Sequence, residues 1–438
     1  MQKNWQYRNF FFVFLFCFVE ALSCPGTGCA LDRAQIKDRT VTFEASTNHG
    51  LIVKEFPLAF IARKDAYSLL IKELGRYRTI AANGGWPEMQ QGILLKKGVR
   101  NDEVAVLRRR LAVSGDLIGE QKESDVFDVE LERAVINFQA CHGLKTDGAV
   151  GPLTLKELNV PASARADQIL VNLERLGWFA DSLGERYVYV NIANYRLDVM
   201  ENGRSVLSMK VIVGKPYWDT PVFSAKMTYL IVNPSWNVPE SIVAEEILPH
   251  IKKDPDYLTK QNITVFKDEK GKAAIIDPAS INWQNMPSKE VPFRFRQQPG
   301  PLNPLGKIKF MFPNKFNVYL HDTPTKGLFD KGARAFSHGC IRIEKPLELA
   351  QYLLKDNPKP MQVDLDKAVA AGEERMMNIA RPIDVHVVYL TAWPDDEGGV
   401  QFRNDVYGRD AKLLAALRDK SSKHEGDSPA QEEPALPR

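Results

Sequence analysis

A cysteine flanked by glycine, histidine and arginine is the part of the sequence best suited to chemistry. Residues 334–342 read Arg-Ala-Phe-Ser-His-Gly-Cys-Ile-Arg, with Cys340 directly after Gly339 and two positions after His338. A neighbouring imidazole and positive charge lower the pKa of a thiol, and the thiolate is the nucleophilic form. Gly339 permits a tight turn that presents successive N–H groups, as an oxyanion hole requires. We therefore predict a nucleophilic role for Cys340.

A second histidine, His321, precedes this segment in the run Tyr319-Leu320-His321-Asp322. If the two segments form neighbouring strand ends, His321 reaches the sulfur of Cys340 as a general base. Asp322 or a backbone carbonyl can then orient the imidazole ring, as in a catalytic triad. Tyr319 can face the same site from this strand, with core packing as an equal alternative.

The same side chains are also zinc ligands, so a metal site is one alternative. His321, Asp322, His338 and Cys340 each offer a suitable donor atom. However, the sequence lacks the paired CxxC or HExxH spacing from which zinc sites are usually built. The other alternative is a cysteine that packs as a small buried hydrophobe. We expect no metal and no other cofactor.

The elements that must position these residues are β-strands. Apolar residues alternate with others from Val188 to Ile192, and Asn202-Gly203 marks a type I′ hairpin before the next alternating run. This pattern predicts a β-rich catalytic domain at 187–365. The segment 240–300 is helical at first and then reads as a loop, which predicts a lid inserted into that domain.

Helical periodicity dominates the chain before this domain, so the fold class is multidomain α+β. An apolar helix face at Val104, Leu107 and Leu111, a helix ending at Gly143 and another opened by Pro152 predict a three-helix domain. The predicted parts outside the catalytic domain are a signal peptide 1–23, a helical scaffold region 30–90, the three-helix domain 92–160, a helical linker 161–186, a C-terminal scaffold segment 366–415 and a disordered tail 420–438.

Other conspicuous side chains have ordinary explanations. The run Arg108–Arg110 can meet an anionic polymer, but we favour a solvated helix face. Trp218, Trp236 and Trp283 can line a groove, although aromatic residues more often belong to a core. Cys141 and His142 are best explained as a buried thiol and a helix-end histidine.

The first residues predict export. Lys3 and Arg8 accompany the apolar run 10–19, which is too short to span a bilayer, and Ala21-Leu22-Ser23 offers a cleavage site. The alternatives are an uncleaved membrane anchor and lipidation of Cys24. The chain has 58 basic and 55 acidic residues, a balance that argues against a nucleic-acid partner.

The motifs also resemble a known family. The run Ser337-His338-Gly339-Cys340-Ile341-Arg342, preceded by His321, matches the signature of the L,D-transpeptidase catalytic domain of the YkuD type. The pattern from Lys97-Gly98-Val99 to Gly151-Pro152 resembles a peptidoglycan-binding domain. The stretches 76–87, 233–236 and 300–303 are similar to the long YcbB-like L,D-transpeptidases of Gram-negative bacteria. The resemblance extends from about residue 45 to 395.

This resemblance implies a two-step acyl transfer in the periplasm. Cys340 attacks the bond between diaminopimelate and the terminal D-alanine of a tetrapeptide stem. D-Alanine leaves, and an amine of a second stem resolves the thioester into a 3→3 cross-link. His321 accepts and donates the proton. His338, Gly339 and Ser337 complete the catalytic segment and its oxyanion region, and the implied substrate-binding residues are Arg342, Tyr319, Arg334 and Asp322.

The implied partners are the stem peptides and glycan of peptidoglycan, together with other cell-wall enzymes, in wall synthesis or degradation and cell shape. Membrane association is limited to the N-terminus. An L,D-carboxypeptidase, or another acyl transferase that attaches a lipoprotein or amidates the donor, remains open on the same scaffold. A non-catalytic wall-binding protein is disfavoured because His321, Ser337, His338, Gly339 and Cys340 are all present.

Overall fold

The computed structural model describes residues 66–119, 123–178, 183–269, 272–287, 291–359, 364–395 and 399–425. The predicted signal peptide, the first part of the predicted scaffold region 30–90 and residues 426–438 of the predicted tail lie outside these ranges. Residues 60–415 form one compact unit. Within the described residues, no helix combines the length and apolar character needed to cross a bilayer.

The predicted helical parts are present. Asn101 caps one helix by accepting from the Glu103 N–H, and Asp128 caps the next by accepting from the Leu131 N–H. Gly143 follows with φ +64°, the left-handed conformation that favours glycine after a helix. Val104, Leu107, Leu111, Leu131 and Phe138 share one apolar core. The helices are α1 (Ala66–Ala82), α2 (Asp102–Ser114), α3 (Val129–Cys141), α4 (Pro152–Leu158) and α5 (Ala162–Gly177).

The arginine run on α2 is not a solvated face, so that prediction was wrong for two of its three residues. Arg108 is buried and its Nη2 donates to Asp128 at 2.5 Å. Arg110 is also buried; its Nε donates to the Leu158 carbonyl at 2.7 Å, and its guanidinium lies 3.7 Å from the Trp86 ring centroid. Guanidinium groups stack on aromatic rings and keep hydrogen bonds in their own plane, which allows such burial.

The predicted catalytic domain is built on a sheet that closes on itself. In the described part of the chain the sheet has nine strands in the order β11-β3-β12-β10-β9-β4-β13-β1-β2, and β2 pairs again with β3. A closed sheet leaves few unpaired edges and encloses its core. The strands are β1 (Arg186–Asn191), β2 (Arg196–Glu201), β3 (Arg204–Gly214), β4 (Phe223–Val232), β9 (Ile308–Met311), β10 (Leu320–His321), β11 (Ala335–Ser337), β12 (Ile341–Ile343) and β13 (Arg375–Val388).

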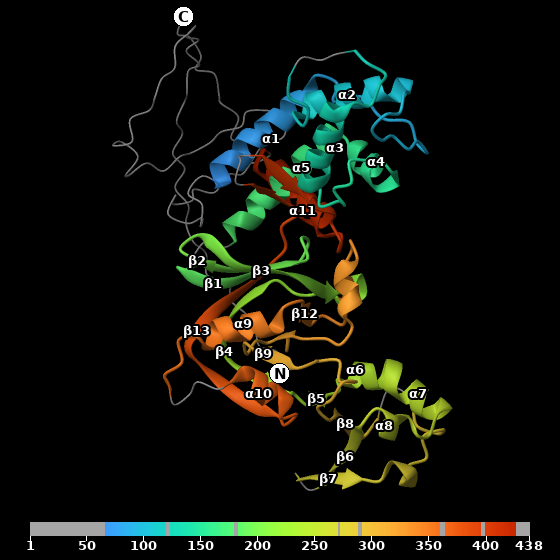
Figure 1. Cartoon of the computed structure of the whole chain (residues 1–438), viewed down its shortest axis with the longest axis vertical. Coiled ribbons are helices and arrows are strands. Elements are labelled where there is room, and N and C mark those ends of the chain that lie inside the picture. The colour runs from blue at the N-terminus through green and yellow to red at the C-terminus, as the bar shows by residue number, and fades with distance from the viewer. Residues whose placement is uncertain are drawn as a thin grey trace, which may run out of the picture. The chain divides into compact units, whose positions relative to one another are not determined.

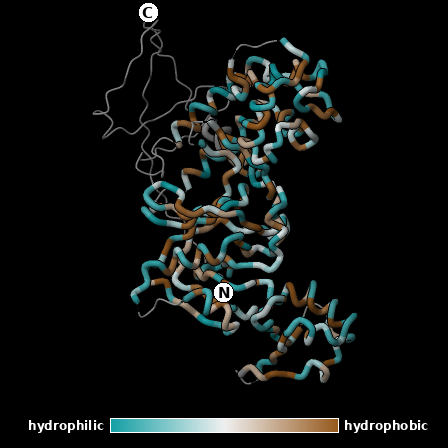
Figure 2. The backbone as a smooth tube through the Cα atoms, in the orientation of Figure 1, coloured by the Kyte–Doolittle hydropathy of each residue, from teal (hydrophilic) through white to brown (hydrophobic). Residues whose placement is uncertain are grey.

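Strand alternation fills this core, as the sequence predicts. Val188 and Val190 of β1 are fully buried within it, so Tyr187 and Tyr189 lie on the outer face. The Asn202-Gly203 hairpin has positive φ at both residues, which a type I′ turn requires. Figure 2 shows hydrophobic residues recurring along these strands and hydrophilic residues at the turns. Helices α9 (Pro346–Leu354) and α10 (Leu365–Ala370) contribute apolar side chains to the same core, with α9 packed on β9 and β13 (Figure 1).

The C-terminal segment is more than a scaffold. Strand β13 lies inside the catalytic sheet, parallel to β1 and antiparallel to β4, although the predicted scaffold segment 366–415 contains it. After β13 the chain forms polar contacts with α5. Asn172 donates to the Thr391 hydroxyl at 2.7 Å, and Arg175 forms an ion pair with Asp410 at 2.5 Å. The elements here are β14 (Ala392–Pro394), β15 (Val400–Phe402) and α11 (Arg409–Glu425), which continues past the predicted start of the tail at Lys420.

The lid insertion is a small subdomain with its own core (Figure 1). Its helices are present, but the loop expected after them is wrong. Residues 263–297 instead supply strands of a sheet which, among the described residues, has four members in the order β5-β8-β6-β7. The lid elements are β5 (Trp236–Asn237), α6 (Glu240–Ile242), the π-helical turn η3 (Val243–Ile247), α7 (Leu248–Lys253), α8 (Tyr257–Lys260), β6 (Ile263–Glu269), β7 (Lys272–Ile276) and β8 (Arg294–Gln297).

One buried asparagine joins the two ends of the lid. The Asn303 side chain donates to the Pro234 carbonyl at 2.9 Å and to the Gln298 carbonyl at 3.2 Å, and it accepts from the Leu305 N–H at 2.9 Å. Pro234 and Gln298 lie on opposite arms of the insertion. Asn303 therefore fixes where the lid leaves and re-enters the catalytic domain.

We predict that Asn303→Ala loosens the lid. Its loss leaves buried carbonyls unsatisfied, at a cost of about 1–3 kcal/mol in the free energy of unfolding. Denaturant titration should show this loss, and hydrogen exchange should accelerate at amides of β6 and β8. The exposed Asn285 gives the matched control, since Asn285→Ala should change neither measurement. Equal behaviour of the two variants would contradict a hinge role for Asn303.

Candidate active site

Strand pairing brings the two predicted catalytic segments together. Strand β10 lies between β9 and β12 and runs parallel to β12, with His321 opposite Arg342 and Leu320 opposite Ile341. Leu320 and Ile341 are fully buried in the core. Because successive side chains point to opposite faces, His321 and Arg342 lie on the outer face of the sheet.

The same register places further side chains on this outer face. Tyr319 is two residues before His321, and Cys340 is two residues before Arg342, so each pair shares a face. On the other side of β10, His321 is opposite Lys309 of β9. The Lys309 ammonium lies 3.9 Å from the centroid of the Tyr319 ring. The outer face therefore gathers a thiol, an imidazole, a phenol and basic groups.

Cys340 is a half-buried thiol with hydrogen-bond partners on the strand beside it. Its Sγ lies 3.9 Å from the Asn317 carbonyl, and both the backbone and the hydroxyl of Tyr319 bond the sulfur. Burial raises the pKa of the Cys340 thiol, although Tyr319, Lys309 and Arg342 act in the opposite direction. The lowered pKa expected from the sequence is therefore wrong, because desolvation outweighs the neighbouring charges.

His321 is buried and neutral. Burial, together with the charge of Arg342, lowers its pKa to about 3, against the smaller opposing effect of its bond to the Asp322 carbonyl. That bond joins Nδ1 and the carbonyl oxygen at 2.6 Å, and a carbonyl only accepts, so Nδ1 carries the proton. His321 shares the outer face with the protonated thiol of Cys340, and a neutral imidazole is suited to accept a proton during reaction.

The carboxylate of Asp322 accepts hydrogen bonds from Lys326 and Lys307 and not from His321. It accepts from Lys326 Nζ at 2.5 Å and from the Lys307 N–H at 2.8 Å. The sequence left open whether this carboxylate or a backbone carbonyl orients His321. In the structure, the backbone carbonyl of Asp322 orients His321, and the Asp322 carboxylate stabilises the turn that precedes β9.

The turn before Cys340 is fixed by Ser337. Its hydroxyl donates to the Cys340 carbonyl at 2.5 Å and accepts from the Gly339 N–H at 3.2 Å. Gly339 has φ +106°, which a side chain would strain, and its carbonyl accepts from the Thr220 hydroxyl at 2.8 Å. The Gly339 N–H is thus occupied. The Cys340 N–H has no acceptor among the described residues, which makes it the candidate oxyanion donor.

Two predicted residues connect the site to the lid. The His338 ring lies 3.9 Å from the Trp218 ring, and its Nε2 is 3.0 Å from Glu246 of the lid. Burial lowers the pKa of His338. Arg342 is half-buried, burial lowers its pKa, and its Nε has no hydrogen-bond partner in the described ranges.

The guanidinium group of Arg334 donates hydrogen bonds to backbone carbonyls. Its Nη1 donates to the Lys331 carbonyl at 2.8 Å, its Nη2 to the Tyr195 carbonyl at 3.1 Å and its Nε to the Val211 carbonyl at 3.2 Å. These bonds secure the loop that leads into β11. They leave Arg334 little capacity for the substrate carboxylate expected from the sequence.

Several residues at the site have no motif to identify them. Lys309 belongs to a short strand whose only signal is alternation of apolar and polar residues. Trp236 of the lid bonds the Tyr319 hydroxyl. From the C-terminal segment, the Tyr407 hydroxyl donates to the Gly214 carbonyl at 2.7 Å and accepts from the Thr220 N–H at 3.2 Å, next to Gly339. Their roles depend on contacts across long stretches of chain.

A metal site finds no support where side chains are described. None of the clusters formed by histidine, cysteine, aspartate and glutamate in these ranges could hold an ion. Cys141 and His142 lie elsewhere: His142 is buried, stacks on Phe138 and bonds its carbonyl at 2.8 Å.

Two families match the chain. Residues 185–364 match the family described as "L,D-transpeptidase catalytic domain" (YkuD), and this range includes Cys340 and His321. Residues 100–158 match the family described as "Putative peptidoglycan binding domain".

Curated relatives match parts of the chain. A protein of Haemophilus influenzae named "Putative L,D-transpeptidase" is 35% identical over 263 residues, 60% of this chain and 51% of that protein. The chain thus spans about half of that relative's length. A Bacillus licheniformis protein named "Probable N-acetylmuramoyl-L-alanine amidase" is 31% identical over 86 residues, 20% of this chain and 24% of that protein.

Solved structures show weaker similarity. An L,D-transpeptidase from Mycobacterium smegmatis is 16% identical with a TM-score of 0.22, covering 46% of this chain and 58% of its own. An L,D-transpeptidase from Stackebrandtia nassauensis is 14% identical with a TM-score of 0.25, covering 69% of this chain and 96% of its own. Scores at this level carry no inference about function.

We predict that Tyr319→Phe makes the thiol harder to ionise. The lost hydroxyl bonds the sulfur and lowers the pKa of Cys340, so its removal raises that pKa further. The rate of alkylation by iodoacetamide, followed by mass spectrometry, should reach its midpoint at higher pH. Tyr229→Phe, on strand β4 of the same domain, is the control and should keep the midpoint of the unaltered protein. A midpoint that does not move in Tyr319→Phe would show that this hydroxyl leaves the thiol unaffected.

We also predict that His321 makes the protein acid-sensitive. Its pKa is about 3 when folded and about 6.5 when unfolded, so only the unfolded chain binds its proton between these values. Stability from this group is complete above pH 6.5 and falls as pH drops towards 3. The loss is about 3 kcal/mol between pH 7 and pH 4. Denaturant titrations should show that His321→Gln lessens the loss, whereas the exposed His250→Gln does not; equal losses would exclude His321 as the source.

Proposed function

We propose that this protein is an exported enzyme that cross-links peptidoglycan through a thioester on Cys340. Residues 185–364 match the L,D-transpeptidase catalytic domain family, and residues 100–158 match a family described as peptidoglycan-binding, which supports this proposal. The observation that carries the proposal is the pairing of β10 with β12, which puts Cys340, His321 and Arg342 on one face. The compartment is the periplasm, with the predicted signal peptide as its support.

In the first step Cys340 Sγ attacks the carbonyl carbon between diaminopimelate and the terminal D-alanine of a tetrapeptide stem. The thiol proton passes to His321, the carbon–nitrogen bond breaks, and D-alanine leaves with a proton from His321. The protonated resting thiol and the neutral imidazole support this order of events. The Cys340 N–H can stabilise the negative charge that develops on the carbonyl oxygen.

In the second step an amine of another stem attacks the thioester. The new amide forms, the carbon–sulfur bond breaks, and the amine proton returns through His321 to the sulfur. When the attacking amine belongs to diaminopimelate, the product is a 3→3 cross-link. One amide replaces another, so the exchange is nearly balanced in free energy and needs no cofactor.

Arg342 is the best candidate to hold a substrate carboxylate. Its half-buried guanidinium shares the outer face with Cys340, and its Nε lacks a hydrogen-bond partner in the described chain. Arginine binds carboxylates through fixed, charge-assisted hydrogen bonds. Its position beside the thiol would align a stem peptide for attack.

Exclusion of water decides between transfer and hydrolysis. The lid reaches the site through Trp236, which bonds the Tyr319 hydroxyl, and through Glu246, which lies 3.0 Å from His338. A lid closed over the thioester favours the amine of a second stem over water. These contacts favour a transpeptidase over the alternative, an L,D-carboxypeptidase or other acyl transferase with the same nucleophile and base.

Purified protein and tetrapeptide muropeptides provide the test. We expect mass spectrometry to detect dimers and released D-alanine, and a carbapenem should add its mass to Cys340. His321→Ala should slow dimer formation by roughly 10²–10⁴-fold, the usual contribution of a general base. Ser337→Ala should retain more activity because this hydroxyl only fixes the turn.

Cys340→Ala is the control and should give neither product nor adduct. If mass spectrometry detects tripeptide monomers and no dimers, the protein is an L,D-carboxypeptidase and not a transpeptidase. Equal losses in His321→Ala and Ser337→Ala would contradict the role given to His321.

A further inference from the structure

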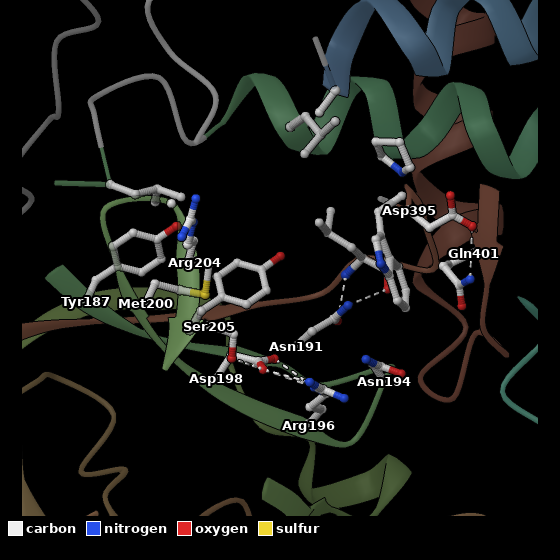
Figure 3. Close-up of a pocket in the computed structure, with 18 of the residues that line it drawn as sticks. Tyr187, Asn191, Asn194, Arg196, Asp198, Met200, Arg204, Ser205, Asp395 and Gln401 are labelled. Atoms are coloured by element: carbon white, nitrogen blue, oxygen red, sulfur yellow. Dashed lines mark hydrogen bonds and ion pairs between the residues drawn. The ribbon is translucent and has the colours of Figure 1, made fainter. Parts of the chain in front are cut away.

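A cavity of about 710 Å³ lies on the outer face of β1 and β2, away from the strands that carry Cys340 (Figure 3). Its size falls within the range of about 300–1,000 Å³ typical of small-molecule sites. The β1–β2 pair forms the floor, and β14, β15 and the helices α1 and α5 contribute the other walls. It is lined by Ala66, Leu176, Leu183, Tyr187, Tyr189, Asn191, Asn194, Arg196, Asp198, Met200, Gly203, Arg204, Ser205, Leu390, Trp393, Pro394, Asp395, Gln401 and Arg403.

The walls of the cavity are firmly joined. Gln168 of α5 donates to the carbonyls of Thr391 and Arg403 at 2.9 and 2.8 Å. On the floor, the Asn191 side chain exchanges hydrogen bonds with the backbone of Leu390 at 3.1 Å. Arg403 Nε donates to Asn194 at 2.7 Å. The cavity is therefore a preformed feature of the fold.

Two of the charged side chains that line the cavity, Arg196 and Asp198, form an ion pair. Arg196 donates to both carboxylate oxygens of Asp198, the shorter bond being 2.9 Å, and Ser205 donates to the same group at 2.8 Å. Arg403 lies 4.8 Å over the Trp393 ring, and burial lowers its pKa to about 10.

Aromatic rings and hydroxyl groups are nevertheless available. Tyr187 is only 3% exposed, yet its hydroxyl has no hydrogen-bond partner in the part of the chain that the structure describes, and Figure 3 shows it directed into the cavity beside Arg204. Tyr189 and Trp393 add further aromatic surface. The Tyr187 hydroxyl can both donate and accept a hydrogen bond, so it is available to a ligand in the cavity.

We propose that this cavity binds the glycan strand of peptidoglycan, separately from the stem-peptide site at Cys340. A pyranose ring presents a C–H face to an aromatic ring and a rim of hydroxyl and acetamido groups to planar polar side chains. Trp393 suits the first, and the Tyr187 hydroxyl, Asn194 and Arg204 suit the second. The choice of glycan as ligand rests on the proposed function.

Calorimetric titration of the full chain with a tetramer of N-acetylglucosamine, which carries no stem peptide, tests the proposal. The double variant Tyr187→Phe/Arg204→Ala should bind the tetramer about thirtyfold more weakly, because it loses two hydrogen bonds worth roughly 1 kcal/mol each. The same substitutions outside the cavity, Tyr229→Phe/Arg381→Ala, should leave the affinity unchanged. Equal melting temperatures for the variants would show that the fold is intact.

The proposal would be overturned if the wild-type protein did not bind the tetramer. It would also be overturned if the cavity variant bound the tetramer as tightly as wild type, and this result would place the sugar on the peptidoglycan-binding domain. Carbapenem acylation of Cys340, measured in the same variants, separates this outcome from failure of the proposed function. Acylation without tetramer binding rejects only the glycan site. Cavity-dependent binding without acylation rejects only the catalytic proposal.

Discussion

The parallel pairing of β10 with β12 is the constraint on which the rest of the structure depends. Leu320 and Ile341 are opposite one another and fully buried, so the core fixes the register of both strands. A slip by one residue would turn every side chain of a strand to the other face. The same register that fills the core therefore sets His321 and Cys340 on the outer face. Stability of the sheet and alignment of the reacting groups have one physical origin.

Burial then sets the chemistry of that face. It raises the pKa of the Cys340 thiol and lowers that of His321, so both groups rest in their neutral forms. In the proposed reaction, charge appears when a proton moves from sulfur to imidazole, and Lys309 and Arg342 favour the resulting thiolate. Trp236 and Glu246 of the lid contact this site directly. In the proposed transfer reaction, the lid and the buried face together exclude water from the thioester.

The C-terminal segment links the parts of the compact unit. Strand β13 completes the catalytic sheet, Tyr407 supports the residues beside Gly339, and Thr391 and Asp410 bind α5. One stretch of chain therefore stabilises the nucleophile's turn and also builds a wall of the cavity on β1 and β2. Removal of this segment would affect both features.

The sequence by itself determined the features that depend on local chemistry. The catalytic segment, the Asn202-Gly203 hairpin, the helix that ends before Gly143 and the helical and β-rich classes all follow from neighbouring residues. Tertiary structure decided the rest, because it depends on partners distant in the chain. Arg108 and Arg110 are buried and bond acceptors distant in the chain, β13 joins a sheet begun nearly 190 residues earlier, and the segment expected as a lid loop pairs into strands. The pKa of Cys340 also rose rather than fell, since desolvation is a property of the packed fold that a list of adjacent residues does not contain.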